Sequence, residues 1–398
     1  MANGLVDELL GHLSELPVLN THSHHRPDSF FAQANLDLLL SNGYVAWCGE
    51  SFDSTRAGRE RYLNQVHNKS YFVWLERSLQ RLYGLEGRLR ADNWDELSHR
   101  VAAAYQTPGH NITLLQQACR YERVVLDTFW SPGDDNGHPD LFAPTFRVNL
   151  FHFGYSPFAQ DHNGNNPLAN CDRAIEDIDE YIAFVRAAIA AKKAQGCVAL
   201  KQALAYDRGL DFLPTDKAHT QRAFRPNPEP EDIKAFQDYV FWQICDIAAE
   251  LDLPLQCHTG LGSLQRTNAM QMQPVIQAHP QTKFVLFHGS YPWTADVCAL
   301  THEYRNVYPD LCWLPIISPT ACERLLHELI EVGLADRVCW GCDTWTGEES
   351  LGALLAMREC LAVVLAEKVQ RGYLGREDAF ATAENILLHN ANKLYFHR

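Results

Sequence analysis

Eight short apolar runs, separated by helical patterns in the second half of the chain, constrain the possible fold more than any other feature. The runs are Val18–His24, Arg123–Trp130, Phe146–Phe153, Cys197–Tyr206, Pro254–Gly260, Lys283–Ser290, Asn306–Leu314 and Val338–Trp345. They are almost continuously apolar, and strict alternation with polar residues is absent. This pattern is typical of parallel strands that are buried on both faces.

Helical patterns fall between the later runs. They cover Ile175–Ala194, Pro230–Ala249, Ala269–His279, Thr320–Val332 and Glu348–Arg371. A series of eight strands with intervening helices in one chain of 398 residues is most simply an α/β fold of the (β/α)8 TIM-barrel type. An open doubly wound sheet is the alternative, but no GxGxxG motif opens its first helix. We therefore predict a barrel.

The interval between the first two runs, about residues 25–121, is too long for one crossover helix. It contains the aromatic segment Tyr71–Leu75 and a helical pattern at Trp94–Tyr105. We predict a helical insertion over the mouth of the barrel. Since no repeat, low-complexity tract or Gly/Ser linker divides the chain, residues 1–398 are expected to form a single domain, with a closing helix pair at Glu377–Leu394.

The formal net charge of −15 argues against a nucleic-acid partner, because binding to phosphates requires a basic surface. No apolar stretch is long enough to cross a bilayer, and Met1–Leu16 lacks the charge pattern of a signal peptide. We expect a cytoplasmic protein with a small-molecule substrate and without a membrane partner; a homo-oligomer is compatible with the sequence.

Twelve cysteines raise the question of disulfides or structural zinc. Most of them lie inside apolar runs, where free thiols pack as small hydrophobic groups. Cys339 and Cys342 form a CxxC motif, but residues three apart on a strand face opposite sides and cannot readily grip one zinc ion. We expect these cysteines to be free.

Residues that can bind a metal recur at the ends of the apolar runs. His22 and His24 close the first run and point to the same side of a strand, so they can chelate one ion. Lys201, His258, His288 and Asp343 lie near the ends of later runs. In a barrel, the carboxyl ends of the strands meet at one mouth, where active sites lie. The pattern predicts a metal site there.

Each of these residues has a simpler explanation when it is taken alone. A single histidine is often a hydrogen-bonded core residue, and Asp343 could cap the segment that follows it. Lys201 is the exception, because a lysine inside an apolar strand is costly unless it is neutralised or paired. All the simpler explanations would have to hold together at one barrel end, which favours the metal site.

The pattern of HxH, Lys, His, His and Asp on these runs resembles that of the amidohydrolase superfamily. Several motifs are similar to those of its FluG-type and uronate-isomerase-related branch: Leu200-Lys201, Ala205-Tyr206, Gly209-Leu210, His258-Thr259-Gly260 and His288-Gly289-Ser290-Tyr291-Pro292-Trp293. The long segment after the first run is also similar to that of uronate isomerases. The resemblance extends from Asn20 to the segment at 390–396.

The resemblance implies a metal site made by His22, His24, His258, His288 and Asp343. It would hold one or two divalent ions, zinc first, with manganese or iron as alternatives. The resemblance also implies that Lys201 is carbamylated and bridges two metals; an unmodified amine that pairs with a substrate carboxylate is the alternative. Asn20 stands where many members have aspartate, which affects the orientation of ligands more than their identity.

A metal-dependent hydrolase that activates water against an amide, ester or lactone bond is the preferred hypothesis. Its catalytic residues would be Asp343 as the proton acceptor, His288 beside the metal or the developing oxyanion, and Lys201. Candidate substrate-binding residues in the loops after the strands are Tyr206, Arg208, Lys217, Arg266, Tyr291 and Trp293. Arginines near a metal suggest a substrate with a carboxylate, although surface ion pairs and simple packing are the alternatives for these side chains.

Two other functions stay open at this stage. One is an aldose–ketose isomerase of sugar acids, which the long segment after the first run favours and Lys201 disfavours. The other is a binding or assembly module without turnover, which the complete set of ligand-type residues disfavours. The number of bound metals and the chemical state of Lys201 would separate hydrolysis from isomerisation.

Overall fold

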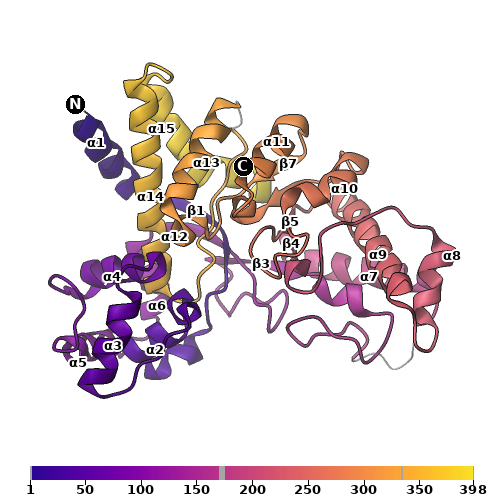
Figure 1. Cartoon of the computed structure of the whole chain (residues 1–398), viewed down its shortest axis with the longest axis horizontal. Coiled ribbons are helices and arrows are strands. Elements are labelled where there is room, and N and C mark those ends of the chain that lie inside the picture. Colours follow the sequence, from indigo (N-terminus) through magenta and orange to yellow (C-terminus); the bar gives the residue numbers. More distant parts are fainter. Residues whose placement is uncertain (1, 170–174, 333–334, 398) are drawn as a thin grey trace.

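A seven-stranded parallel sheet forms the centre of the computed structural model, which describes residues 2–169, 175–332 and 335–397 (Figure 1). The strands are β1 (Val18–Ser23), β2 (Tyr121–Leu126), β3 (Phe142–Arg147), β4 (Ala199–Gln202), β5 (Leu255–Cys257), β6 (Phe284–Leu286) and β7 (Val307–Pro309). They follow one another in space in chain order, and each pairs in parallel with the next. Parallel neighbours require crossover connections, so the chain winds in one direction around the sheet.

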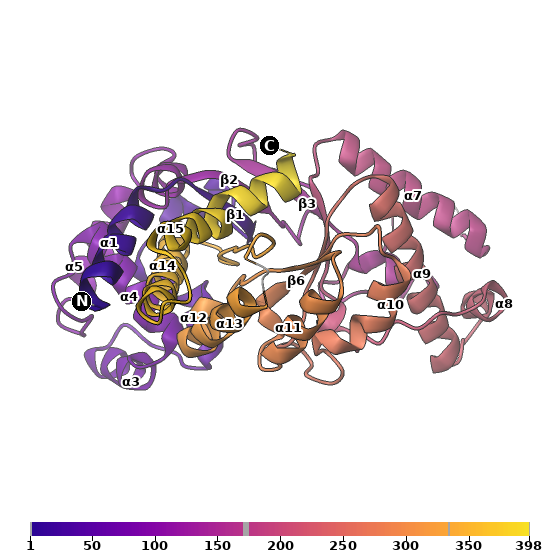
Figure 2. The ribbon, with the colours of Figure 1, turned by 90° about the horizontal axis from the view of Figure 1, so that it is seen from above.

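Helices supply these crossovers and cover the sheet. The α-helices are α1 (Ala2–Glu15), α2 (Leu36–Ser41), α3 (Arg56–Val66), α4 (Ser70–Tyr83), α5 (Trp94–Ala104), α6 (His110–Thr113), α7 (Ile178–Ala194), α8 (Lys217–Thr220), α9 (Pro230–Glu250), α10 (Gln273–Ala278), α11 (Thr294–Glu303), α12 (Leu314–Ile317), α13 (Pro319–Glu331), α14 (Gly347–Gln370) and α15 (Arg376–Glu384). Figure 2 shows α7, α9, α10, α11 and α13 on the outside of the curved sheet.

Short helices complete the described chain. These short helices are η1 (Asp28–Gln33), η2 (Tyr44–Cys48), η3 (Leu114–Ala118), η4 (Asn149–Phe153), η5 (Leu204–Tyr206), η6 (Gln221–Phe224), η7 (Ala269–Met272), η8 (Phe287–Ser290), η9 (Asn385–His389) and η10 (Asn392–Phe396). Of these, η4, η5 and η8 follow the carboxyl ends of β3, β4 and β6. The helical predictions agree with α7, α9, α13 and α14 to within three residues at each end, whereas the predicted helix Ala269–His279 is divided into η7 and α10. The predicted C-terminal pair is α15 followed by η9 and η10.

Side chains from the strands fill the interior that the sheet encloses. One buried cluster joins Leu19 of β1, Val125 of β2, Ala199 of β4 and Val285 of β6. Residues from η9, from η10, from the link between them and from the segments after β7 belong to the same cluster: Cys312, Cys339, Leu388, Ala391, Leu394 and Tyr395. The enclosed space is therefore a packed core, as in barrels whose inward side chains form layers.

The predicted eighth strand, Val338–Trp345, is not confirmed, because the described residues there form only one isolated parallel bridge, between Asp310 and Cys339. The segment still bonds to both edges of the sheet. The Cys339 amide donates to Pro309 of β7 over 2.9 Å, and the Asp343 amide donates to His22 of β1 over 2.9 Å. A backbone φ of 62° at Asp343 interrupts the extended conformation that a regular strand needs.

The predicted third strand was wrong in position. Phe146–Phe153 was expected, but β3 ends at Arg147 and the residues from Asn149 to Phe153 form η4. Val148 has φ −98° and ψ 4°, which ends the extended backbone, and the Asn149 side chain accepts a hydrogen bond from the Ala203 amide over 2.7 Å. Apolar residues in η4 pack beside the sheet on the cluster that holds α7 and α9, so they continue the apolar pattern without continuing the strand.

The residues between β1 and β2 form helices α2 to α6 with an apolar cluster of their own, which includes Leu36, Tyr62, Phe72 and Trp94. This helical part is joined to the rest of the molecule where α4 packs against α14. Within the described residues no helix is both long and apolar enough to span a membrane. The eleven described cysteines are free, and the CxxC pair is buried and unbridged.

Replacement of Gly341 by Ala tests the packing of the segment 338–345 beside β1. A β-carbon at this position would lie 2.6 Å from the His22 amide nitrogen and 2.9 Å from Thr21 Oγ1. We expect Gly341→Ala to lower the free energy of unfolding by about 1–3 kcal/mol, the usual cost of overpacking, as measured by chemical denaturation. Gly11→Ala is the matched control, because its β-carbon in α1 meets nothing within 4 Å and should leave stability equal or higher. Equal stability of the Gly341→Ala variant would contradict the packing described here.

Candidate metal centre

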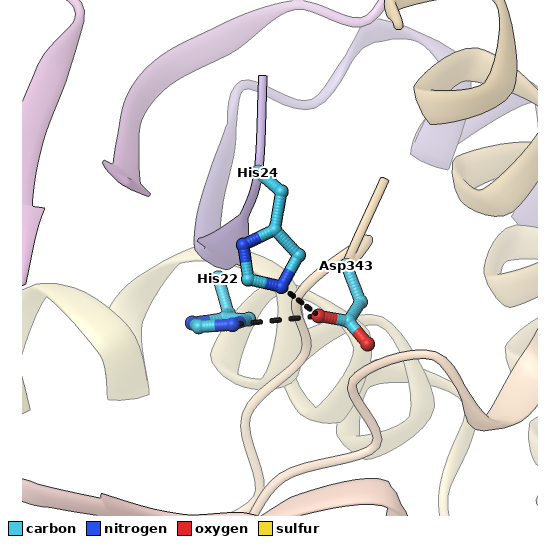
Figure 3. Close-up of side chains that lie close together, drawn as sticks. All are labelled: His22, His24 and Asp343. Atoms are coloured by element: carbon cyan, nitrogen blue, oxygen red, sulfur yellow. Dashed lines mark ion pairs between the residues drawn. The ribbon is translucent and has the colours of Figure 1, made fainter. Parts of the chain in front are cut away.

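Three buried side chains from the two ends of the chain converge at the carboxyl end of the sheet. Nε2 of His22 lies 3.4 Å from Oδ1 of Asp343, and Nε2 of His24 lies 3.3 Å from the same oxygen (Figure 3). The histidines come from the end of β1 and the segment just after it, while Asp343 comes from the segment that bridges β7 and β1. Two imidazole nitrogens and a carboxylate oxygen form a donor set suited to a divalent metal.

Hydrogen bonds behind the two histidines aim their Nε2 atoms at Asp343. Gln256 in β5 donates its amide protons to the Thr21 carbonyl and to the Tyr395 hydroxyl, so its Oε1 accepts from His22 Nδ1 over 3.1 Å. His24 Nδ1 donates to the Asp127 carbonyl over 2.7 Å. Both Nδ1 atoms face acceptors, so both Nε2 atoms are left to face Asp343, which is the arrangement of a metal-binding histidine.

The protonation state of His22 also suits a metal ligand. Burial, together with the charge of Lys201, lowers the pKa of His22 well below its usual value, so the imidazole is neutral. Its Nε2 is buried and has no hydrogen-bond partner among the described residues. A buried polar atom without a partner is costly, and a cation at this position would supply the missing interaction.

A second donor group adjoins the first and shares Asp343 with it. It consists of His288, Cys312 and Asp343. His288 Nδ1 donates to the Cys312 carbonyl, and His258 Nε2 faces the Leu261 carbonyl. Carbonyl oxygens only accept, so both imidazoles direct a proton outward and leave two nitrogen lone pairs facing each other at 2.9 Å. Only a cation between the rings, a proton or a metal, removes this repulsion.

A proton is disfavoured at the His258–His288 pair. Burial lowers the pKa of His288 to about 4, and burial together with His288 lowers the pKa of His258 well below its usual value. The donor chemistry of this pair therefore fits a metal better than a proton. The structure thus brings His22, His24, His258, His288 and Asp343 into one region, and their function as ligands stays a prediction.

Asp343 is ionised and held from both sides. Burial alone would raise its pKa, but the close contact with His24 and the other neighbouring histidines outweigh burial and hold the pKa well below the usual range. Its Oδ1 faces His22 and His24, while its Oδ2 accepts a hydrogen bond from the Tyr44 hydroxyl over 2.7 Å. Tyr44 therefore fixes the rotation of the carboxylate.

Lys201 lies in β4 with only 2% of its surface exposed. Its Nζ is 3.9 Å from the ring centre of Phe287, and no carboxylate is in hydrogen-bond contact with it among the described residues. Burial lowers the pKa of the amine to about 8, against the opposing charge of Asp343. The neutral form of the amine is therefore more populated near neutral pH than in an exposed lysine.

A cavity of about 170 Å³ opens onto the cluster. It is lined by His24, Tyr44, Trp47, Phe129, Arg147, His162, Asn163, Lys201, Tyr206, His258, Asp343 and Trp345. Arg147 is buried at the end of β3 and donates through Nε and Nη2 to Oδ2 of Asp127, over 3.1 and 2.6 Å. The cavity therefore presents two cationic side chains and several aromatic walls next to the metal cluster.

The predicted substrate-binding residues lie in different places. Tyr206 lines the cavity, with its ring centre 4.6 Å from that of His258. Arg208 pairs with Asp238 at 2.7 Å, and Arg266 pairs with Asp211 at 3.0 Å; both line a neighbouring cavity instead. Their role in substrate binding stays a prediction.

The remaining predicted residues do not belong to the described lining of the site cavity either. Tyr291 packs against the hydrophobic core, Trp293 is 37% exposed, and Lys217 pairs at the surface with Asp179.

Several residues of the site are not among those predicted from the sequence. Asp127 and Arg147 are charged residues inside two of the predicted strands, so the signal that marked Lys201 marked them as well. Gln256 lies two residues before His258, on the same predicted strand. Tyr44 carried no such signal, because only the tertiary structure brings it from the helical part to Asp343.

Glu349, at the start of α14, connects the helical part with the site. Its carboxylate accepts hydrogen bonds from the amides of Tyr44, over 2.5 Å, and Trp345, over 3.3 Å. Both of these residues line the cavity. Burial raises the pKa of Glu349 to about 7, against the opposing effect of these hydrogen bonds.

The raised pKa of Glu349 predicts a pH-dependent stability. The folded state binds the proton more tightly than the unfolded state, whose pKa is near 4.5, so the wild type loses stability as pH rises from about 4.5 through 7. Glu349→Gln does not titrate, so its free energy of unfolding should increase relative to wild type between pH 5 and 8, by about 1.4 kcal/mol per unit of pKa difference. Urea unfolding of both proteins at matched pH measures this. A constant difference across the range would show that Glu349 does not titrate there.

The hydrogen bond from His22 to Gln256 predicts a change in metal affinity. Gln256→Leu removes the acceptor that orients His22, and we expect a roughly 10- to 100-fold loss of zinc affinity in competition titrations with a chelator. Gln256→Glu keeps an acceptor for His22 Nδ1 and should bind zinc more tightly than Gln256→Leu. Gln370→Leu, at an exposed position at the end of α14, is the control. Wild-type affinity of Gln256→Leu would refute the orienting role.

Known proteins resemble this chain in sequence and in fold. The family model for amidohydrolases (Amidohydro_2) matches residues 170–396. The protein fluG of Emericella nidulans is 34% identical over 220 residues, which are 50% of this chain and 25% of fluG, so the chain matches about a quarter of this relative's length.

Two solved structures share the fold over almost the whole chain. A uronate isomerase from Thermotoga maritima has a TM-score of 0.77 at 16% identity, covering 99% of this chain and 97% of its own. A protein from Lactobacillus casei, provisionally named a metal-dependent hydrolase, has a TM-score of 0.71 at 17% identity, covering 98% and 97%. The family model spans more than half of the chain, and the chain belongs to the amidohydrolase family.

Proposed function

We propose that this protein is a metal-dependent hydrolase that cleaves an amide, ester or lactone bond of a small substrate bearing a carboxylate. The observation that carries this proposal is the convergence of the His22 and His24 Nε2 atoms on Oδ1 of an ionised, buried Asp343. Membership in the amidohydrolase family supports it.

The metal would be held by His22, His24 and Asp343, and a second ion by His258 and His288 with Asp343. Zinc is the first choice for nitrogen and carboxylate ligands, with manganese or iron as alternatives. When bound, such an ion activates water as a nucleophile and polarises the scissile carbonyl. The unpartnered His22 Nε2 and the facing lone pairs of His258 and His288 support this assignment.

Asp343 is the proton carrier in this proposal. Its carboxylate is ionised, so it can accept a proton from the attacking water and deliver it to the leaving group. The Tyr44 hydroxyl holds Oδ2, which keeps Oδ1 directed at the reacting centre between the histidines. His288 would either hold the second ion through Nε2 of its neutral imidazole or, with a proton on Nε2, stabilise the developing oxyanion.

Arg147 and Lys201 support a substrate carboxylate. Both are buried, both line the site cavity, and a guanidinium or an amine in such a place recognises a carboxylate strongly. Aromatic side chains of Tyr44, Phe129 and Trp345 line the same cavity and would pack against the apolar part of the substrate.

We further infer that Lys201 is carbamylated in the loaded enzyme. Only the neutral amine reacts with carbon dioxide, and the lowered pKa of about 8 increases its population. A nitrogen–carbon bond forms and one proton is released, so the product is a carbamate whose anionic oxygens can bind a metal; it replaces a buried ammonium that has no described carboxylate partner. Arg147 alone would then bind the substrate carboxylate, whereas an unmodified Lys201 would share that role.

A cytoplasmic location is part of the proposal. The free described cysteines are consistent with it, because a reducing compartment keeps thiols unbridged.

Isomerisation of a sugar acid is the second candidate. The likeness in fold to the uronate isomerase of Thermotoga maritima covers almost the whole chain and favours it. One metal at His22, His24 and Asp343, with an unmodified Lys201, would suit this reaction, in which a metal holds a carbonyl and a hydroxyl while a base moves a proton.

Labelled water separates the two reactions. The zinc-loaded protein is incubated with carboxylate-bearing amides, esters and lactones, and separately with uronates, in water containing heavy oxygen or deuterium. Hydrolysis places one solvent oxygen in the product, while isomerisation exchanges a carbon-bound hydrogen with solvent. Elemental analysis and intact mass give the metal count and the state of Lys201. Isomerisation without any hydrolysis would overturn the proposal, and so would a stable protein without metal and without turnover.

Asp343→Asn tests the proton carrier. The amide cannot accept the proton, so we expect turnover of the best substrate from that panel to fall at least about a thousandfold, while histidine ligands retain most of the metal. Asp140→Asn, at an exposed position, is the matched control and should keep full activity. Turnover near the wild-type rate in the Asp343→Asn variant, at equal metal content, would exclude this role.

A further inference from the structure

A second charged cavity lies far along α14 from the metal cluster, among helices α1, α4 and α14. These helices pack together on one side of the molecule (Figures 1 and 2). The cavity measures about 250 Å³, and its lining includes Arg77 and Arg81 of α4 and Arg358 of α14. It shares no lining residue with the site cavity. We propose that it is a binding site for a phosphate group.

The burial of Arg358 and its lack of hydrogen-bond partners at two nitrogens are the main support for this proposal. Arg358 is 3% exposed, and its Nε and Nη2 atoms have no hydrogen-bond partner among the described residues. Burial lowers its pKa to about 10, which still leaves the guanidinium charged at neutral pH. A buried guanidinium with two unpartnered donor nitrogens is costly, so a residue of this kind points to a ligand that supplies acceptors.

No described carboxylate forms an ion pair with Arg358, and Glu359, the one carboxylate in the described cavity lining, pairs with Arg77. Its strongest electrostatic neighbours are Cys119 and Tyr121, whose pKa values burial raises, so both are neutral, and the further arginines Arg81 and Arg120. Arg120 pairs with Glu15 at 3.4 Å, outside the cavity lining. Within the described chain, no carboxylate is bonded to Arg358. A bound anion would relieve the repulsion among these arginines.

The other cavity residues fit an oxyanion. Arg77 stacks on Trp74 with its guanidinium carbon 4.4 Å from the ring centre and pairs with Glu359 at 2.6 Å, so it is held in place. Arg81 is exposed and has no ion pair among the described residues. Three arginines against one glutamate leave an excess of two positive charges, which matches the charge of a phosphate near neutral pH.

The planar guanidinium group binds phosphate oxygens through paired N–H donors. The chain as a whole has a formal net charge of −15, so this local excess of positive charge is not part of a generally basic protein. Leu10 and Leu355 add apolar walls, which leave room for a small organic group attached to the phosphate. The ligand is therefore either free phosphate or a small phosphomonoester.

Phosphate titrations of the metal-loaded full chain test the site. Inorganic phosphate, glycerol phosphate and acetate are each added at constant ionic strength balanced with chloride, and thermal unfolding and isothermal titration calorimetry are measured. We expect saturable stabilisation of the wild type by one or both phosphate probes and at most a weak effect of acetate. The tighter of the two phosphate probes identifies whether free phosphate or a phosphomonoester is the natural ligand class.

Three variants locate the binding. Arg358→Met removes the buried charge with little change in volume, so it should fold with equal or greater stability without phosphate and lose phosphate affinity at least tenfold. Arg81→Met, at an exposed position that does not affect folding, should weaken binding several-fold. Arg222→Met, an exposed arginine in η6 outside the cavity, should bind as the wild type does.

Two results would overturn the inference. One is a wild type that phosphate and glycerol phosphate stabilise no more than chloride does at equal ionic strength. The other is phosphate binding that Arg358→Met and Arg81→Met leave unchanged, which would place the bound anion elsewhere, including at the metal. Both results are independent of the proposed hydrolase activity, because neither readout uses turnover.

Discussion

The backbone hydrogen bonds of residues 339–344 are the constraint on which the rest of the site depends. They join this segment to β7 at Pro309 and to β1 at His22, so the last part of the chain lies against the first strand. Asp343 reaches the two histidines only because of this pairing. A positive φ at Asp343 then turns the carboxylate-bearing residue out of the strand direction and toward the cavity.

A second layer of hydrogen bonds makes the cluster chemically specific. Gln256 and the Asp127 carbonyl determine which nitrogen of His22 and His24 carries the proton, and Tyr44 determines which oxygen of Asp343 faces them. Burial keeps His22 neutral, and the neighbouring histidines hold the pKa of Asp343 low, so its carboxylate is ionised. Burial without a partner makes these polar side chains unfavourable in the folded protein. The same burial therefore prepares them to bind a cation.

Much of the fold could be predicted because periodicity and length are local properties. The near-continuous apolar runs identified the parallel sheet, and the helical patterns located α9 and α14 closely. The third strand was misplaced because η4 is as apolar as a strand, and packing against neighbouring helices, rather than pairing, accounts for its apolar residues. The eighth strand was not confirmed, since hydrogen bonding to both edges does not require a regular extended backbone.

The sequence by itself determined which residues could take part in metal chemistry, because ligand type and the ends of apolar runs are visible along the chain. Only the tertiary structure decided which of them meet. It brought Tyr44 and Arg147 to the cavity and held Arg208 and Arg266 in ion pairs outside it. The reason is physical: side-chain distances and burial depend on contacts between segments that are separated by 20 residues for Arg147 and Asp127 and by 299 for Tyr44 and Asp343, which no local pattern specifies.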